Sequence, residues 1–302
     1  MFLSEKKLTM TRSLTYSFIL SLVLFSCSSY TGETDNSIGK TSGFIDDSWI
    51  IQRVAKSKER LSRSPAGSKL LESIDAHGGL GKWFSNGPLS FHFDYQPLGD
   101  GMRRNTRQVV DQWSVRAVHK VADNPDYTYG WDGEDAWVFP DTADIGVNPR
   151  FWATTPFYFV GLPFVLADEG VILEELDPQE YNGVTYDLIK ASYESGVGDA
   201  PDDYYVIYIH PETKLMGGLR YIVSYPGFFP NGGHLPEKFM EITGLQAADG
   251  ITIPSGYNTY WFKEGQPAEH ITKIDVKDFS FAPGTPKDFF EIPEGARLQE
   301  GL

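Results

Sequence analysis

Residues 148–168, NPRFWATTPFYFVGLPFVLAD, are the stretch around which the rest of this sequence is interpreted. They concentrate large apolar side chains, and prolines recur within them at every seventh position, 149, 156 and 163. A membrane-spanning helix needs about 20 apolar residues without such breaks, and each proline tends to end or kink a helix. We therefore predict a broken helical plug or lid that packs under a curved sheet and does not span a bilayer. An ordinary core segment without a ligand is the alternative interpretation.

Outside this stretch, much of the chain shows the two-residue alternation of half-buried strands. Residues 89–95 alternate strictly, and Asn182-Gly183 is a strong hairpin signal. Further strand patterns cover residues 106–119, 127–131, 136–139, 184–193, 204–209, 219–225, 238–245, 251–261 and 271–281. The pattern predicts a mainly β (α+β) domain, built as a single curved antiparallel sheet of roughly ten strands that wraps the plug.

The start of the sheet domain has a clear helix signal. Ser64 is a suitable N-cap and Pro65 a suitable first helical residue. An apolar stripe follows, and His77-Gly78-Gly79 supplies a glycine stop. We therefore place the folded domain at residues 64–302.

The N-terminus has the form of a secretory signal. Basic side chains precede the apolar run 18–25, which ends directly before Ser26-Cys27. The cysteine after Leu-x-Ser resembles the lipobox of bacterial lipoproteins, and Cys27 is the only cysteine in the chain. We predict a lipoprotein signal peptide at 1–26, acylation and membrane anchoring at Cys27, and a polar tether at 27–63 in which a short helix could form. An uncleaved helix with an incidental cysteine is the alternative.

The composition restricts the partners of the folded part. The chain has 26 basic and 41 acidic side chains, a formal charge of −15. A net negative charge of this size repels phosphate backbones, so nucleic acid is not expected as a partner. For the same reason, anionic lipid surfaces are disfavoured for the body of the protein.

Three motifs together resemble the LolA-like superfamily, which includes lipoprotein-sorting carriers and related lipoproteins. They are the helix end at residues 75–79 with Trp83 after it, the hairpin at 129–137, and the ending Phe-Phe-Glu-Ile-Pro-Glu-Gly at 289–295. The resemblance spans about residues 64–298. It implies a curved half-barrel with helices across its concave face and a hydrophobic cavity that receives acyl chains. The lipobox makes this chain more similar to anchored members than to the soluble carrier, and residues 148–178 and 196–203 are apparent additions.

A cavity for an acyl chain needs a concave apolar lining, because the chain has nothing to hydrogen-bond. The strand faces and the plug offer candidates for this ligand-binding lining: Phe91, Phe93, Trp113, Trp152, Phe157, Phe159 and Phe164, with Val109, Tyr186 and Leu188 beside them. If these side chains meet without a gap, they form a filled core instead, and the sequence does not separate the two cases.

Catalytic motifs are absent from the sequence, which has no G-x-S-x-G elbow, H-E-x-x-H, P-loop or dinucleotide fingerprint. The histidines are scattered singly, so no enzyme is expected, although a site assembled across strands is possible. Asp199, Asp202 and Asp203 on a glycine-rich loop could ligate Ca²⁺, but an acidic solvated turn is the favoured interpretation. No other cofactor is expected.

Phe228 and Phe229 lie between turn-forming residues, so they could dip into a membrane or meet a partner. The alternative is that both rings fold back onto the core.

The expected protein is an envelope lipoprotein, anchored through Cys27 in the outer membrane and facing the periplasm. It would act as a non-enzymatic carrier or receptor that binds a lipid or lipoprotein acyl chain. The first alternative is a cell-envelope interaction or structural module with a filled core. The second is a carboxylate-dependent hydrolase.

Overall fold

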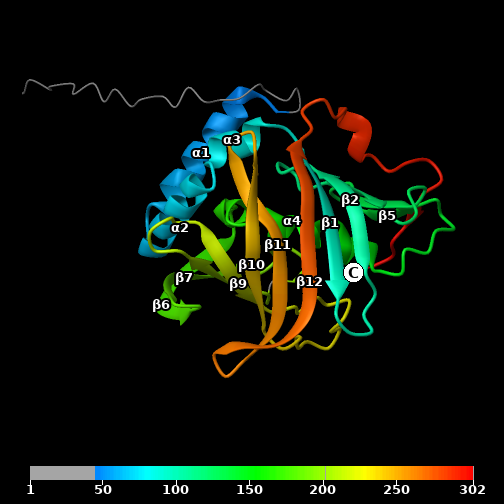
Figure 1. The fold of residues 1–302 in the computed structure, drawn as a ribbon. Helices are drawn as coiled ribbons and strands as arrows, with labels where there is room; N and C mark the ends of the chain where they lie inside the picture. Colours follow the sequence, from blue (N-terminus) through cyan, green and yellow to red (C-terminus); the bar gives the residue numbers. More distant parts are fainter. Residues whose placement is uncertain (1–44, 201, 302) are drawn as a thin grey trace, which may run out of the picture. The chain divides into compact units, whose positions relative to one another are not determined.

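The computed structural model describes residues 45–200 and 202–301. The expected signal peptide, Cys27 and much of the expected tether lie outside the described residues. The described chain forms one antiparallel sheet of thirteen strands in the order β13-β5-β4-β3-β2-β1-β12-β11-β10-β9-β8-β7-β6 (Figure 1). The strands are β1 (Leu89–Pro97), β2 (Arg104–Val110), β3 (Ala117–Val121), β4 (Thr128–Trp131), β5 (Ala136–Phe139), β6 (Val171–Tyr181), β7 (Val184–Tyr193), β8 (Tyr205–Ile209), β9 (Met216–Tyr221), β10 (Lys238–Ala248), β11 (Ile251–Lys263), β12 (Gln266–Phe281) and β13 (Arg297–Leu298).

The sheet consists of two meanders. Strands β1 to β5 follow one another in space as in sequence, and so do β6 to β12. The pairing of β1 with β12, which sets Tyr95 opposite Ile274, joins the two meanders into one surface. Because edge strands β13 and β6 do not pair with each other, the sheet stays open, and it forms the curved half-barrel predicted from the sequence.

The N-terminal helices begin and end as the residue types require. Helix α2 (Pro65–Ala76) starts at Ser64, whose side chain accepts a hydrogen bond from the Gly67 N–H, and it ends at His77, as predicted. Helix α3 (Leu80–Ser85) follows. Helix α1 (Asp47–Leu61) lies within the range assigned to the tether and buries Ile50 and Leu61. The folded part therefore begins before residue 64, because α1 has an apolar face that packs on the core.

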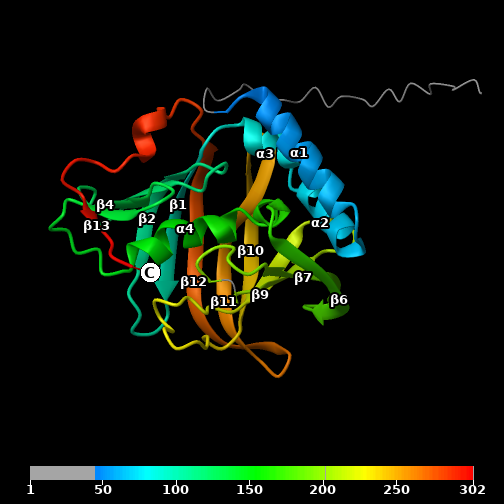
Figure 2. The same cartoon turned by 180° about the vertical axis from the view of Figure 1, so that it is seen from behind.

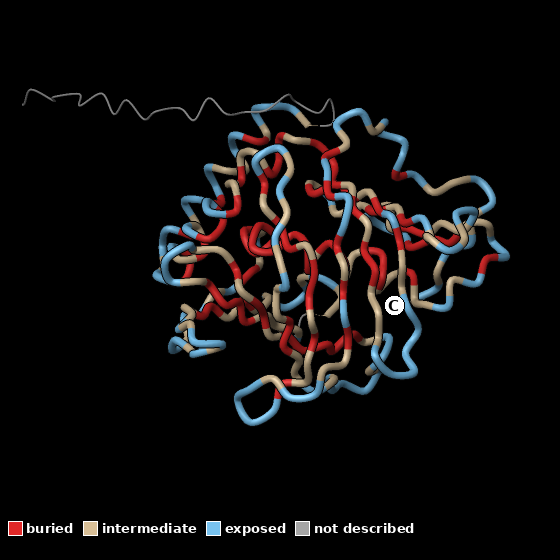
Figure 3. Tube along the Cα trace, viewed as in Figure 1, coloured by how far each residue is buried: buried red, intermediate tan, exposed pale blue. Residues whose placement is uncertain are grey.

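The apolar stretch forms the predicted broken helical plug, although Pro156 lies inside its helix and does not end it. Helix α4 (Pro149–Val160) ends at Gly161, and a short 3₁₀ helix, η1 (Phe164–Ala167), follows. Figure 2 shows α4 crossing one face of the sheet, the concave face. Buried positions run along the strands and through this segment (Figure 3). Among the described helices, none is long and apolar enough to cross a membrane.

Some predicted strands are wrong in extent: the one at 219–225 ends at Tyr221, and the one at 271–281 begins at Gln266. Residues 106–119 form two strands, β2 and β3, joined by a turn. The Asp111 carboxylate accepts hydrogen bonds from the Ser114 N–H and hydroxyl and from Arg116 Nε. These local bonds satisfy the backbone in a turn conformation and thereby compete with continuation of the strand.

Candidate functional site: a tyrosine-lined pocket beside α4

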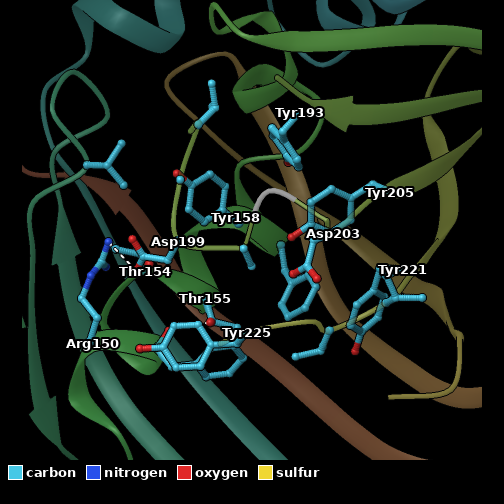
Figure 4. A pocket seen from close by; sticks show the side chains of 18 of the residues that line it. Arg150, Thr154, Thr155, Tyr158, Tyr193, Asp199, Asp203, Tyr205, Tyr221 and Tyr225 are labelled. Carbon is cyan, nitrogen blue, oxygen red and sulfur yellow. Dashed lines mark hydrogen bonds and ion pairs between the residues drawn. The ribbon is translucent and has the colours of Figure 1, made fainter. Parts of the chain in front are cut away.

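A pocket of about 220 Å³ lies between α4, the loop that follows β7, and strands β7 to β9. Figure 4 shows the tyrosine side chains from these elements around it. The lining comprises Val115, Trp131, Arg150, Phe151, Thr154, Thr155, Tyr158, Phe159, Tyr193, Val197, Gly198, Asp199, Ala200, Asp203, Tyr205, Tyr221, Ile222, Val223 and Tyr225. The walls are thus mainly aromatic, with hydroxyl groups and a few charges distributed among the rings.

Strand alternation and α4 position the rings. Tyr205 and Tyr221 lie opposite each other on β8 and β9, and their ring centroids are 6.3 Å apart. Tyr221 also contacts Phe159 of α4, with 5.1 Å between centroids. The side chains of one helix and two strands therefore enclose a single space.

Four tyrosine hydroxyl groups of this pocket are neutral and without a hydrogen-bond partner in the described chain. Burial raises the pKa of Tyr158 to about 12 and those of Tyr205 and Tyr221 well above their usual value. The hydroxyls of Tyr158, Tyr193, Tyr205 and Tyr221 have no hydrogen-bond partner among the described residues. They can donate to, or accept from, a ligand that has polar atoms.

Arg150 and Asp199 form an ion pair across the pocket rim. Their side chains meet at 2.7 Å and are only 14% and 26% exposed. The Arg150 guanidinium also lies over the Trp131 ring, 3.5 Å from its centroid. The pair therefore connects the first turn of α4 to the loop between β7 and β8, and we refer to it as the latch.

The three aspartates proposed as metal ligands do not converge. Asp199 is engaged by Arg150, Asp202 is exposed and outside the pocket lining, and Asp203 accepts a hydrogen bond from the Ser224 N–H at 2.6 Å. Burial is the main cause that raises the pKa of Asp203. Within residues 45–200 and 202–301, no group of three or more His, Cys, Asp or Glu side chains is placed to hold a metal ion.

Of the seven aromatic residues expected to line a cavity, Phe159 lines this pocket and the other six do not. Phe91, Phe93, Phe157 and Phe164 are buried in the core. Trp152 packs on Tyr95, and Trp113 donates its Nε1–H to the Phe84 carbonyl. The physical reason is that these rings find partners: Trp83 stacks on Phe164 at 4.4 Å and on Phe157 at 6.2 Å, which fills the space.

Sequence reasoning missed the tyrosines. Tyr193 and Tyr205 stand at the strand ends on either side of the acidic loop, and this position is the signal that could have identified them, whereas Tyr221 stands at the end of β9. Their hydroxyls distinguish them from the phenylalanines of the filled core.

The loop with Phe228 and Phe229 adjoins the pocket. Phe228 is 47% exposed, and its ring lies 5.0 Å from that of Phe151 and 5.2 Å from that of Tyr225, both of which line the pocket. Phe229 is half-buried. The Phe228 ring thus rests on the pocket wall while keeping an exposed edge, and its contact with a membrane or a partner stays a prediction.

Comparison with known proteins finds similarity in structure alone. No family model and no curated protein matches the sequence. A LolA superfamily protein from Nitrosomonas europaea aligns with a TM-score of 0.51 and 10% identity over 76% of this chain and 99% of that protein. A DUF1329 family protein from Desulfovibrio piger gives 0.49 and 13% identity, covering 76% and 98%. A domain from Vibrio parahaemolyticus, assigned as an outer membrane lipoprotein-sorting protein, gives 0.47 and 9%, covering 74% and 95%.

The chain therefore has a LolA-like fold, as its three short motifs predicted. At these identities the similarity concerns the fold, and the site must be argued from its own residues.

Proposed function

We propose that this protein is a lipid carrier or receptor of the bacterial cell envelope that binds a lipid or an acyl chain in the tyrosine-lined pocket. The observation that carries the proposal is the pocket itself, enclosed between α4 and the concave face of an open LolA-like sheet. Burial of apolar surface contributes about 25 cal/mol per Å², or about 0.8 kcal/mol for each CH₂ group. Partition of an acyl chain into such walls therefore needs no covalent step, and the protein would act without catalysis.

The walls also favour a ligand that has polar atoms next to its chain. A bare hydrocarbon in the pocket would leave the hydroxyls of Tyr158, Tyr193 and Tyr205 without hydrogen-bond partners. An ester or amide group beside the chain would accept hydrogen bonds from them. Acyl chains linked to a glycerol or a protein have such groups.

Access to the pocket would be controlled at the Arg150–Asp199 latch. Its release would free the loop between β7 and β8 from α4. Anchoring through Cys27, in the outer membrane and facing the periplasm, would keep the pocket near lipid, and the exposed edge of Phe228 would be the first contact with a membrane or a partner.

The test is mass spectrometry of organic extracts from a full-length Cys27→Ser form, secreted and purified without detergent. The expected result is lipid in stoichiometric amount. Ala200→Trp and Thr154→Trp place a large ring in the pocket from two different elements and should each reduce the bound lipid several-fold. Ala55→Trp is the matched control, because Ala55 is exposed on α1 and away from the pocket.

A folded wild-type protein with a clean extract, and no uptake of added lipid, would overturn the carrier proposal. The filled core around Trp83 would then favour an interaction or structural module of the envelope. The hydrolase alternative has less support, because Asp202 lies outside the pocket and Asp199 is held by Arg150.

A further inference from the structure

Two cationic side chains, Arg104 of β2 and Lys238 of β10, lie on the concave face without an acidic partner. Neither forms an ion pair or a hydrogen bond with any described residue. Both are half-buried, and the Nε atom of Arg104 is buried and unsatisfied. A charge removed from water without a partner costs free energy, so this pair needs an explanation.

Strand register places both side chains under α4. Arg104 lies opposite Tyr95, and its guanidinium is 5.0 Å from the centroid of the Tyr95 ring and 4.5 Å from that of Trp152 of α4. Lys238 lies opposite Tyr221 on one side and Trp261 on the other, with Nζ 5.7 Å and 5.4 Å from those ring centroids. Because Tyr221 itself contacts α4 through Phe159, the two cations approach the helix from the same face of the sheet.

A chain of contacts spans the strands between the two cations: Arg104 lies over the Tyr95 ring, the Tyr95 hydroxyl accepts from Thr272, and Thr272 lies opposite Thr259 on β11, the strand that pairs with β10. Burial and the positive charge of Arg104 together lower the pKa of Lys238 to about 8. Burial likewise lowers the pKa of Arg104. Like charges that converge in a half-buried position are stabilised when an anion lies between them.

A further unpartnered polar group lies on the same face. Thr259 of β11 is 2% exposed, and its Oγ1 has no hydrogen-bond partner. It is two residues from Trp261 along the strand, so both side chains point to the concave face. A hydroxyl donor and two cations are a donor set that suits phosphate or carboxylate oxygens.

This local charge is opposite to that of the whole protein, whose formal charge is −15. The acidic body does not attract anions over a distance, so an anion must be brought here by another attraction. Tyr221 supplies the connection, because its ring lies under Lys238 and also lines the tyrosine-lined pocket.

We propose that Arg104 and Lys238 bind the anionic headgroup, a phosphate or a carboxylate, of an amphiphile whose chain occupies the adjoining tyrosine-lined pocket. This inference rests on the proposed function and specifies its ligand class. The chain supplies the apolar attraction, and the two cations select for a negative head. Thr259 and the Tyr95 hydroxyl, which accepts a hydrogen bond from Thr272, are the neighbouring polar groups.

The experiment measures binding of probes with one chain length to the delipidated full-length Cys27→Ser form by isothermal titration calorimetry. The probes are a lysophosphatidic acid, the free fatty acid and the neutral monoacylglycerol, with inorganic phosphate as the probe without a chain. We expect both anionic amphiphiles to bind at least roughly tenfold more tightly than the monoacylglycerol, and this preference to shrink as salt is raised.

The variant Arg104→Gln/Lys238→Gln should weaken binding of the anionic probes and bring the affinities of the anionic and neutral probes within roughly twofold. Arg107→Gln is the matched control, since Arg107 is on the same strand but exposed and paired with Asp278. Thermal unfolding of both variants checks that they fold. Because the double variant removes unpartnered buried charges, it should be at least as stable as wild type.

The outcomes separate the two proposals. Equal affinity for anionic and neutral amphiphiles, or a preference that the double variant retains, overturns the headgroup site and leaves the acyl-chain pocket standing. Tight binding of inorganic phosphate with no binding of any amphiphile overturns both the amphiphile assignment and the carrier proposal, and it assigns the cations to a free anion. Binding of no probe overturns both proposals.

Discussion

The two sides of the apolar stretch pack differently in this fold. Around Phe157 and Phe164, the rings stack on Trp83 and are buried. Around Tyr158 and Phe159, the facing strands present tyrosines, and a pocket of about 220 Å³ remains. A high density of aromatic residues therefore does not by itself predict a cavity. Flat rings fill space when they can stack, whereas rings whose hydroxyls need polar partners are less readily packed against one another.

The filled and the open region should also contribute differently to stability and to ligand binding. The filled region should account for much of the free energy of unfolding, because its side chains are removed from water and in contact. The open region should contribute less to stability and more to ligand selection. Four substitutions test this division.

The largest expected effect is that of Trp83→Ala in the filled region. Loss of the indole leaves a cavity beneath Phe157 and Phe164, and this should lower the free energy of unfolding by about 3–5 kcal/mol. Urea denaturation measures it. A loss below about 1 kcal/mol would mean that the region is not tightly packed.

A smaller effect of opposite sign is expected for Lys238→Met. The pKa of Lys238 in the folded chain is lowered to about 8 from 10.5. Folding at neutral pH therefore carries an unfavourable charge burial, and the variant without ligand should be more stable by about 1–3 kcal/mol at pH 7. Urea denaturation of wild type and variant gives this difference.

The same pair gives a pH signature. Between pH 8 and 10.5 the unfolded chain keeps a proton that the folded Lys238 releases, so wild-type stability should rise relative to Lys238→Met, and the difference should vanish near pH 10.5. Arg104 stays charged in this window, and the facing Tyr221 stays neutral because burial raises its pKa. Binding of an anionic amphiphile should weaken over the same window. A difference that does not change with pH would contradict this account of Lys238.

Next in size is Arg150→Gln, which removes the latch from the open region. The pair is half-buried, so the expected loss of stability is about 1 kcal/mol. Lipid exchange should become faster, because the loop between β7 and β8 is no longer held to α4. Stopped-flow release of a fluorescent fatty acid measures the rate. An unchanged rate would show that the latch does not control access to the pocket.

The smallest stability effect is expected for Phe228→Ser, within about 0.5 kcal/mol, since the ring is 47% exposed. Transfer of lipid from vesicles should nevertheless slow, because Phe228 is the exposed aromatic residue at the pocket wall. Phe289→Ser, at another exposed phenylalanine, is the control. Equal effects of the two substitutions on transfer would show that the loop has no special contact with the membrane.

Much of the fold was predictable because local rules govern it. The Ser64 cap, Pro149 at the start of α4, and the turn at Asn182-Gly183, where both residues have positive φ, act within a few residues of the chain. The wrongly predicted strand at 106–119 also has a local cause, because hydrogen bonds of the Asp111 side chain stabilise a turn there.

The candidate site was not predictable in the same way. Tyr205 and Tyr221 enclose a space with Phe159 only because distant strands pair and α4 crosses them. Arg104 and Lys238 are far apart in sequence, on strands of different meanders, and they converge only on the concave face of the folded sheet. The amino-acid sequence by itself determined the strands, the caps and the break in the plug, because backbone hydrogen bonds and alternation act over short distances. Tertiary structure alone decided which rings stack and which enclose a pocket, because packing depends on partners that the chain brings together from far apart.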